Sequence, residues 1–174
     1  MLWQVHGHDL LQTHHDSEEN RKADAHWTDE KRLALISKSA DCIPILAFSK
    51  NLNRVLAIHA GWRGVQNRIV PKSLQALGSA WDIYIGPHIT KSSFEIQDDC
   101  FTLLEKCTRL NSKEWFLNGK ADLYKITLDQ IKEVEGACNS LNKLVIDTKF
   151  DMRFHSHRRD REAAGRQNSF IVLL

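Results

Sequence analysis

Residues 39–64 read SADCIPILAFSKNLNRVLAIHAGWRG. Two apolar runs in this stretch, Ile43–Phe48 and Val55–His59, have the length of strands. The segment between them, 49–53, is polar and contains asparagines, which are typical turn residues. The stretch therefore predicts an antiparallel β-hairpin, and the rest of the fold is expected to build on it.

The register of this hairpin brings two chemically active side chains together. If the turn centres between Lys50 and Asn51, Cys42 lies directly opposite His59. Directly opposed residues have Cβ atoms ~5 Å apart, so a thiolate and an imidazole there can share one metal ion or one proton. A slip by one residue would separate them, because it turns every side chain to the other face.

Hydrophobic spacing predicts further elements on both sides of the hairpin. Apolar runs of strand length lie at Leu33–Ser37, Ile83–Ile85, Leu144–Ile146 and Ser169–Leu173. Helical spacing of apolar residues predicts helices at Asp98–Leu110 and Thr127–Leu141. Gly64–Leu77 is also helix-like, but Pro71 within it predicts a kink or two short pieces. Together these elements indicate an α/β (α+β) fold, a layered sandwich of mixed β-sheet with flanking helices.

Length and composition indicate one folded domain over residues 1–174, with 42% hydrophobic and 26% charged residues. The formal charge of +2 includes no long basic run, and no stretch approaches the ~20 apolar residues of a membrane helix. We therefore expect a small-molecule substrate rather than nucleic acid or a membrane as partner, and the oligomeric state stays open. No signal-peptide pattern is found, so a cytoplasmic location with reduced cysteines is expected.

The pairing of Cys42 with His59 suits Zn²⁺, which accepts sulfur and nitrogen ligands in tetrahedral geometry. A third histidine would leave the fourth position open for water or substrate. His6 is the candidate, because it lies in a short strand-like segment beside Gly7, where the backbone can come close to the site. Spacing alone does not separate His6 from the other histidines of the chain.

Structural roles stay open for these residues and are favoured for others. A cysteine at the start of a strand is often a small buried hydrophobe, and a histidine at a strand end often hydrogen-bonds locally. Cys100, Cys107 and Cys138 fall on the apolar faces of predicted helices, so we expect them in the core. His14 and His15 lie in a polar loop and are expected to be solvated.

A second cluster, HSHRRD at residues 155–160, combines histidines with arginines. On a strand its two histidines, at alternate positions, point the same way. Guanidinium groups match phosphate oxygens, so Arg158 or Arg159, and also Arg63, are candidates for holding a phosphate. The alternative is that these arginines are surface charges paired with nearby carboxylates.

Six segments resemble the YfiH-type laccase-domain family, also called peptidoglycan editing factors, in the order in which that family carries them. They are QVHG at 4–7, ADCIP at 40–44, HAGWRG at 59–64, IGP at 85–87, FEI at 94–96 and SHRRD at 156–160. The resemblance implies a zinc site on His6, Cys42 and His59. It also implies a layered fold similar to the catalytic domain of bacterial deamidating toxins.

Members of this family have been described as multicopper polyphenol oxidases, as purine nucleoside phosphorylases and deaminases, and as editors of peptidoglycan precursors. Nucleoside chemistry fits the residues best, because one open zinc site beside arginines can serve phosphorolysis and deamination. We therefore expect a zinc-dependent purine nucleoside phosphorylase for adenosine, inosine or methylthioadenosine, with adenosine deaminase activity. Copper is the alternative metal. Cys42, His59 and Asp41 are the expected catalytic residues, and Arg63 and Arg158 the expected phosphate ligands.

Rival interpretations follow from the same residues. Cys42 can instead be a thiolate nucleophile activated by His59, as in a hydrolase or amidase acting on peptidoglycan precursors. Polyphenol oxidation and a metal-stabilised nucleoside-binding module without turnover are the others. The chain begins almost at QVHG, so we expect it to lack the family's usual N-terminal portion. It also carries Lys91-Ser-Ser-Phe and Asp147 where cysteines are common in the family, which puts catalytic competence in doubt rather than metal binding.

Overall fold

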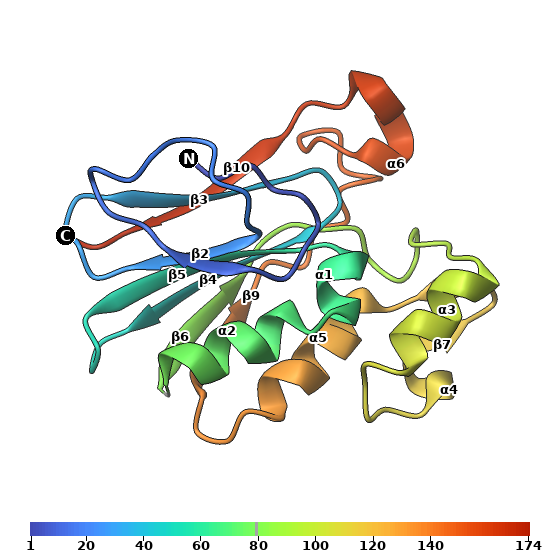
Figure 1. Ribbon diagram of the computed structural model, residues 1–174. Helices are drawn as coiled ribbons and strands as arrows, with labels where there is room; N and C mark the ends of the chain where they lie inside the picture. Colours follow the sequence, from blue (N-terminus) through green and yellow to red (C-terminus); the bar gives the residue numbers. More distant parts are fainter. Residues whose placement is uncertain (79) are drawn as a thin grey trace.

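The computed structural model describes residues 1–78 and 80–174, and its strands and helices form a mixed α+β fold (Figure 1). The strands are β1 (Leu10–Gln12), β2 (Ala25–Thr28), β3 (Ala34–Ser39), β4 (Ile43–Ser49), β5 (Arg54–Ala60), β6 (Trp81–Ile85), β7 (Phe116–Leu117), β8 (Lys120–Ala121), β9 (Cys138–Lys143) and β10 (Gln167–Val172). The helices are α1 (Trp62–Gln66), α2 (Ile69–Leu77), α3 (Asp98–Glu105), α4 (Ser112–Trp115), α5 (Leu123–Lys132), α6 (His157–Asp160) and the short 3₁₀ helix η1 (Arg161–Ala163).

A mixed six-stranded sheet in the order β1-β2-β5-β4-β6-β9 forms the centre of the fold. Its outer pairs, β1 with β2 and β6 with β9, are parallel, and its inner pairs are antiparallel. A separate antiparallel pair of β3 and β10 lies on one face of this sheet, and α1, α2 and α5 lie on the other (Figure 1). The predicted layered sandwich is therefore confirmed.

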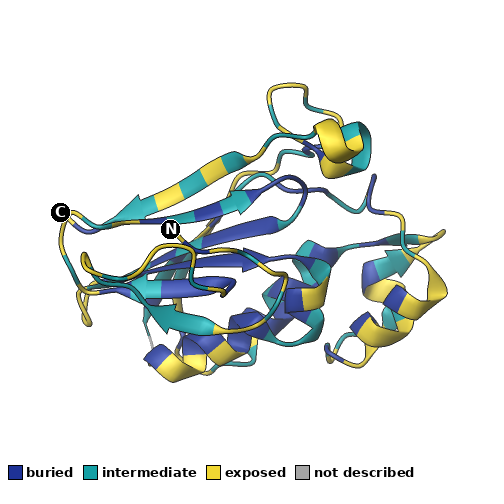
Figure 2. Ribbon diagram, turned by 45° about the horizontal axis from the view of Figure 1, so that its top comes forward, coloured by how far each residue is buried: buried dark blue, intermediate teal, exposed yellow. Residues whose placement is uncertain are grey.

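The core forms where these layers meet, because each central strand is apolar on both faces. In Figure 2 the middle strands are coloured as buried along most of their length, and exposure increases toward the outer helices and β10. Ile43, Ile45 and Leu56 pack against the helix layer. Val55 and Leu35 pack in a smaller cluster under the β3–β10 pair. None of the helices described in the structure is long and apolar enough to cross a membrane.

The predicted hairpin is present as β4 and β5, but its register differs from the prediction. His59 lies opposite Pro44, and Ser49 opposite Arg54 closes the hairpin across a four-residue loop. Cys42 therefore lies just before β4 and not directly across from His59. The shift amounts to two residues, and because strands alternate with a period of two, it leaves the side chains on their predicted faces.

The helix-like stretch after the hairpin divides into two pieces, as predicted. The break is at Asn67 and Arg68, where Arg68 adopts a left-handed φ of 63°. Pro71 does not cause it, because this residue lies in the first turn of α2, where the missing N–H removes no helical hydrogen bond.

Two predictions near the C-terminal half were wrong. The helix expected over Thr127–Leu141 ends at Lys132, before Gly136, which adopts a φ of 68°. The following chain is β9, so the expected strand Leu144–Ile146 lies beyond the observed one. Cys138 is consequently exposed on an edge strand rather than buried on a helix, whereas Cys100 and Cys107 are buried as expected. The helix expected at Asp98–Leu110 begins at Asp98 and ends at Glu105.

The buried histidine of β2, His26, predicts a pH dependence of stability. Its ring nitrogens contact Thr13 Oγ1 and the Ile36 carbonyl, each at 3.3 Å. Burial lowers its pKa from 6.5 to about 4, so between these values the unfolded chain binds the proton and the folded protein does not. Stability should therefore fall by up to about 3 kcal/mol as the pH drops from 6.5 to 4.

Urea denaturation of zinc-free protein at pH 7, 5 and 4 measures this effect. His26→Gln, which keeps an amide donor for the Ile36 carbonyl but cannot be protonated in this range, should lose less stability over the same interval. An equal loss in the variant and the parent protein would show that His26 does not carry the dependence.

Candidate metal centre

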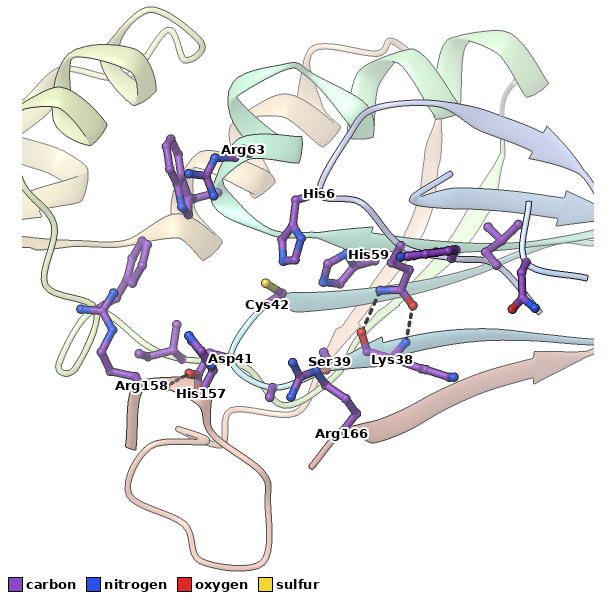
Figure 3. Close-up of a pocket in the computed structure, with 18 residues that line it drawn as sticks. His6, Lys38, Ser39, Asp41, Cys42, His59, Arg63, His157, Arg158 and Arg166 are labelled. Atoms are coloured by element: carbon purple, nitrogen blue, oxygen red, sulfur yellow. Dashed lines mark hydrogen bonds between the residues drawn. The ribbon is translucent and has the colours of Figure 1, made fainter. Parts of the chain in front are cut away.

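Three side chains from separate segments converge at one end of the central sheet. They are His6 of the N-terminal segment, Cys42 just before β4, and His59 near the end of β5 (Figure 3). One ligand atom from each lies within 4.8 Å of the other two. The rings of His6 and His59 meet edge to face, with centroids 5.0 Å apart. The three residues singled out from the sequence are therefore close enough to share an ion.

Asp24, directly before β2, supports two of these ligands. Its carboxylate is buried; one oxygen accepts from His59 Nδ1 at 2.8 Å and from the His6 backbone N–H at 3.0 Å. The other oxygen accepts from the backbone N–H groups of Val5 at 3.1 Å and Gly7 at 2.6 Å. Because Nδ1 of His59 donates to Asp24, its Nε2 is left for a metal or a proton.

The chain is unusually tight around the cluster. His6 adopts a left-handed φ of 59°, which Asp24 holds in place through the bonds on either side of it. Gly61 packs against the site, and a Cβ at this position would lie 3.0 Å from Cys42 Sγ and 3.1 Å from His6 Cδ2. A side chain at position 61 would therefore crowd Cys42 and His6, so this first glycine of the HAGWRG motif favours the close approach of the chain to the site.

Cys42 and His59 form a charged pair in the absence of metal. Burial alone would raise the pKa of the Cys42 thiol, but hydrogen bonds from His59 and His6 outweigh it and lower this pKa from 9.0 to about 6. Burial would lower the pKa of His59, but its bonds to Asp24 and Cys42 raise it to about 9. At neutral pH the sulfur is therefore a thiolate, the form that binds metals and acts as a nucleophile.

The lowered pKa predicts selective alkylation of Cys42. In chelator-treated protein at pH 7, Cys42 should react with iodoacetamide, with a rate that rises through a midpoint near pH 6. Cys138 is more exposed, but burial of its sulfur and the nearby Asp82 raise its pKa, so it should react more slowly. Peptide mass spectrometry of the labelled sites measures both rates in one sample, and faster labelling of Cys138 would contradict the prediction.

The cluster opens into a cavity of about 640 Å³, in the size range of small-molecule sites. Both arginines predicted as phosphate ligands line it. The guanidinium of Arg63 lies 4.6 Å from the Trp62 ring, and that of Arg158 lies 5.5 Å from the Phe94 ring. The cavity is therefore lined by candidate metal ligands, by cationic side chains and by aromatic rings.

Asp41 also lines the cavity, and both of its carboxylate oxygens have donors. Thr148 Oγ1 donates to one at 2.7 Å, and the backbone N–H of Arg158 donates to the other at 2.6 Å. Asp41 thereby ties the β3–β4 loop to the segment that carries Arg158. The role expected for Asp41 toward ligand or proton stays a prediction.

The second sequence cluster is arranged differently from its prediction. Residues 157–160 form α6 and not a strand, so the two histidines diverge. His157 lines the cavity, whereas His155 packs against Gly165, where a Cβ would lie 2.5 Å from the ring. Arg159 pairs with Asp160 at 2.7 Å, which leaves Arg158 as the arginine of this cluster that faces the cavity.

Further lining residues were not identified from the sequence. They include Trp3 of the N-terminal segment, Lys38 of β3 and Arg166, which lies directly before β10. Neither Lys38 nor Arg166 belongs to a residue pattern that marks a site. Their positions beside the cavity follow from the pairing of β3 with β10, which are far apart in the sequence, so they are visible only in the folded chain.

Asp147, singled out in the sequence as a departure from the family pattern, forms a cluster of its own. Its carboxylate accepts from the hydroxyls of Thr90, Ser92 and Ser93 and from the backbone N–H of Lys149. Burial would raise its pKa, but these hydrogen bonds outweigh burial and lower it. The cluster contains none of the three candidate ligands.

A family model described as multi-copper polyphenol oxidoreductase laccase matches residues 1–174. A Clostridium acetobutylicum protein named purine nucleoside phosphorylase is 32% identical over 180 residues, which cover 98% of this chain and 75% of that protein. A Rickettsia conorii protein with the same name is 30% identical, with coverage of 91% and 70%.

Solved structures share the fold. YlmD from Geobacillus stearothermophilus superposes with a TM-score of 0.87 at 25% identity, covering 97% of this chain and 71% of that one. The hypothetical protein YfiH of Bacillus licheniformis superposes with a TM-score of 0.90 at 22% identity, covering 98% and 72%.

Proposed function

Because the chain belongs to the multi-copper polyphenol oxidoreductase laccase family, we propose that residues 1–174 act as one laccase-like domain that cleaves purine nucleosides with phosphate. Adenosine, inosine and methylthioadenosine are the proposed substrates, and deamination of adenosine is a second activity of the same site. The observation that carries the proposal is the convergence of His6, Cys42 and His59 in a cavity that arginines also line. The names of its relatives support the same substrate class.

The donor set fits zinc. One sulfur and two imidazoles within 4.8 Å of one another are ligands that Zn²⁺ binds in catalytic sites with three protein ligands. Asp24 orients His59 from behind, as carboxylates commonly do for metal-binding histidines. When bound, the metal supplies Lewis acidity at a position open to substrate. Copper is the alternative, because thiolate and imidazole also suit it.

Phosphorolysis needs an anion held beside the sugar. Arg63 and Arg158 are proposed to hold hydrogen phosphate, since the guanidinium of each lies near an aromatic ring and neither forms an ion pair with a carboxylate of the described residues, 1–78 and 80–174. A phosphate oxygen forms a bond to C1′ while the C1′–N9 bond breaks, and the electron pair leaves with the base. The proton of hydrogen phosphate ends on the base, so the products are adenine and ribose 1-phosphate.

Deamination needs water in place of phosphate. The water oxygen adds to C6 of adenosine, one of its protons passes to the amino nitrogen and the other ends on N1, and the C6–N bond breaks so that ammonia departs and inosine forms. The two reactions therefore share a binding site and differ in the attacking oxygen.

Incubating zinc-loaded protein with adenosine, with and without phosphate, tests the proposal. Adenine and ribose 1-phosphate, formed only when phosphate is present, are the expected products of phosphorolysis. Inosine formed in both samples is expected from deamination. Folded, zinc-loaded protein that yields neither would overturn the proposed function and leave nucleoside binding without turnover as the alternative, which calorimetry with adenosine detects.

One observation favours a second candidate function. The lowered pKa of Cys42 and its contact with His59 also describe the nucleophile and base of a cysteine hydrolase or amidase. In that case zinc should inhibit amide hydrolysis, and alkylation of Cys42 should abolish activity without changing metal-dependent stability. If Cys42 is a ligand, zinc protects it from alkylation until a chelator is added.

Polyphenol oxidation by a copper cluster has less support from the residues. Such a cluster needs several sets of ligands, and the part of the chain that the structure describes, all but residue 79, holds one grouping of three metal-type side chains. Oxygen uptake with a phenolic substrate after copper loading tests this activity directly.

A further inference from the structure

Phosphorolysis by the proposed route requires a group that gives a proton to the departing purine. Arginine, lysine, amide, indole and hydroxyl side chains do not exchange protons readily near neutral pH. Of the other polar side chains that line the cavity, the three candidate metal ligands belong to their own cluster, and both carboxylate oxygens of Asp41 have donors. Among the lining residues that the structure describes, one further histidine, His157, is left for this role.

His157 is the first residue of α6, and the residue that follows this helix orients its ring. Nδ1 of His157 lies 3.1 Å from the backbone carbonyl oxygen of Arg161. Because a carbonyl oxygen only accepts hydrogen bonds, Nδ1 carries a hydrogen and donates it. Nε2 has no hydrogen-bond partner within residues 1–78 and 80–174, so it is the nitrogen that can give or take up a proton.

The same helix carries one of the proposed phosphate ligands. Arg158 follows His157 directly, its Nη1 donates to the Glu95 carbonyl at 2.9 Å, and its guanidinium lies 5.5 Å from the Phe94 ring. Its backbone N–H donates to Asp41, and Figure 3 shows His157 beside these two residues. The start of α6 is therefore fixed against the β3–β4 loop, which holds His157 on the side of the cavity where phosphate is proposed to bind.

We propose that His157 is a catalytic residue, the acid that protonates the departing purine, an inference that rests on the proposed function. The doubly protonated ring gives its Nε2 hydrogen to a ring nitrogen of the purine, while the C1′–N9 bond breaks and its electron pair moves onto the base. The phosphate, now bonded to C1′, releases its proton to solvent, and His157 regains one from solvent, so the overall products are unchanged. Deamination leaves the C1′–N9 bond intact and does not use this step.

Phosphorolysis of inosine and 7-methylinosine by zinc-loaded His157→Asn tests this role. The asparagine amide can replace Nδ1 as donor to the Arg161 carbonyl, but it removes Nε2. For inosine, kcat should fall about 100-fold while KM stays within about threefold. For 7-methylinosine, kcat should stay within about threefold of the parent protein, because the methyl group on N7 already gives the base the positive charge that a proton would bring. His155→Asn, in an exposed histidine that packs against Gly165, is the matched control and should cleave both nucleosides like the parent.

The two substrates separate proton transfer from a structural role of the ring. Cleavage of inosine by His157→Asn at the parent rate would overturn the catalytic acid and leave the proposed function standing. Equal losses with inosine and 7-methylinosine would also overturn it, because they would show that the ring supports the cavity and not the proton transfer. Parent protein that cleaves neither nucleoside would overturn the proposed function, and the catalytic acid with it.

Discussion

Replacing Cys42 by serine is expected to lower the zinc content of the purified protein from about one ion per chain to about a tenth of that or less. A serine hydroxyl stays protonated at neutral pH, so the site loses its sulfur ligand and the negative charge that accompanies it. Phosphorolysis of adenosine should fall at least about 1,000-fold, because a Lewis acid contributes several kcal/mol to such reactions.

Metal analysis after dialysis and a phosphorolysis assay measure the two effects. Cys138→Ser is the matched control, because Cys138 is exposed on β9 and takes no part in the cluster, so zinc content and activity should both be kept. Full zinc content and activity in Cys42→Ser would contradict the metal centre. Full zinc content with lost activity would favour Cys42 as a nucleophile.

The central hairpin shows how far local sequence determines this fold. Two apolar runs around a polar turn predict β4 and β5, because a strand length and a turn are local properties. The register is less local, because it depends on how many residues form the loop. The loop has four residues, so His59 pairs with Pro44, and Cys42 lies two residues before the position predicted for it. The predicted approach of Cys42 to His59 is still present, because a shift of two residues leaves both side chains on the same face of the sheet.

The errors elsewhere have a related cause. The apolar spacing around Cys138 and Leu141 fits a helix, but these residues form an edge strand that pairs with β6. Pairing partners for an edge strand lie far away in sequence, so periodicity alone does not identify it. The strand β1 was missed for the same reason, because it is three residues long and is stabilised by its parallel pairing with β2.

The candidate ligands were accessible to sequence reasoning, whereas the residues that position them were not. Cys42 and His59 were identified from the predicted hairpin, and the resemblance to a known family singled out His6, already a candidate, from the other histidines. Asp24 is 35 residues away from His59 and precedes a strand that was not predicted. A lone aspartate in such a place has no local signature, and its function became visible only when its hydrogen-bond partners were known.

Asp24 is therefore the residue whose replacement should reveal most about the site. Its buried carboxylate accepts four hydrogen bonds, two of them from the His6 backbone and the His59 ring. In Asp24→Asn, the amide nitrogen must face either two backbone N–H groups or the Nδ1 hydrogen of His59. The second arrangement would reverse the tautomer of His59 and put a hydrogen on Nε2, the nitrogen proposed to bind the metal.

We expect Asp24→Asn to lose about 3–5 kcal/mol of stability, as when one partner of a buried charged pair is removed. Its zinc affinity should fall about 10- to 100-fold, the usual cost of losing the carboxylate behind a metal-binding histidine. Urea denaturation and zinc competition with a chelator measure the two effects.

Asp147→Asn is the control that separates the loss of stability from the loss of zinc affinity. It removes a hydrogen-bonded carboxylate that touches none of the candidate ligands. It should therefore destabilise the fold while keeping zinc affinity within about twofold. Equal zinc affinities in the two variants would show that Asp24 supports the fold of this region and not the metal centre.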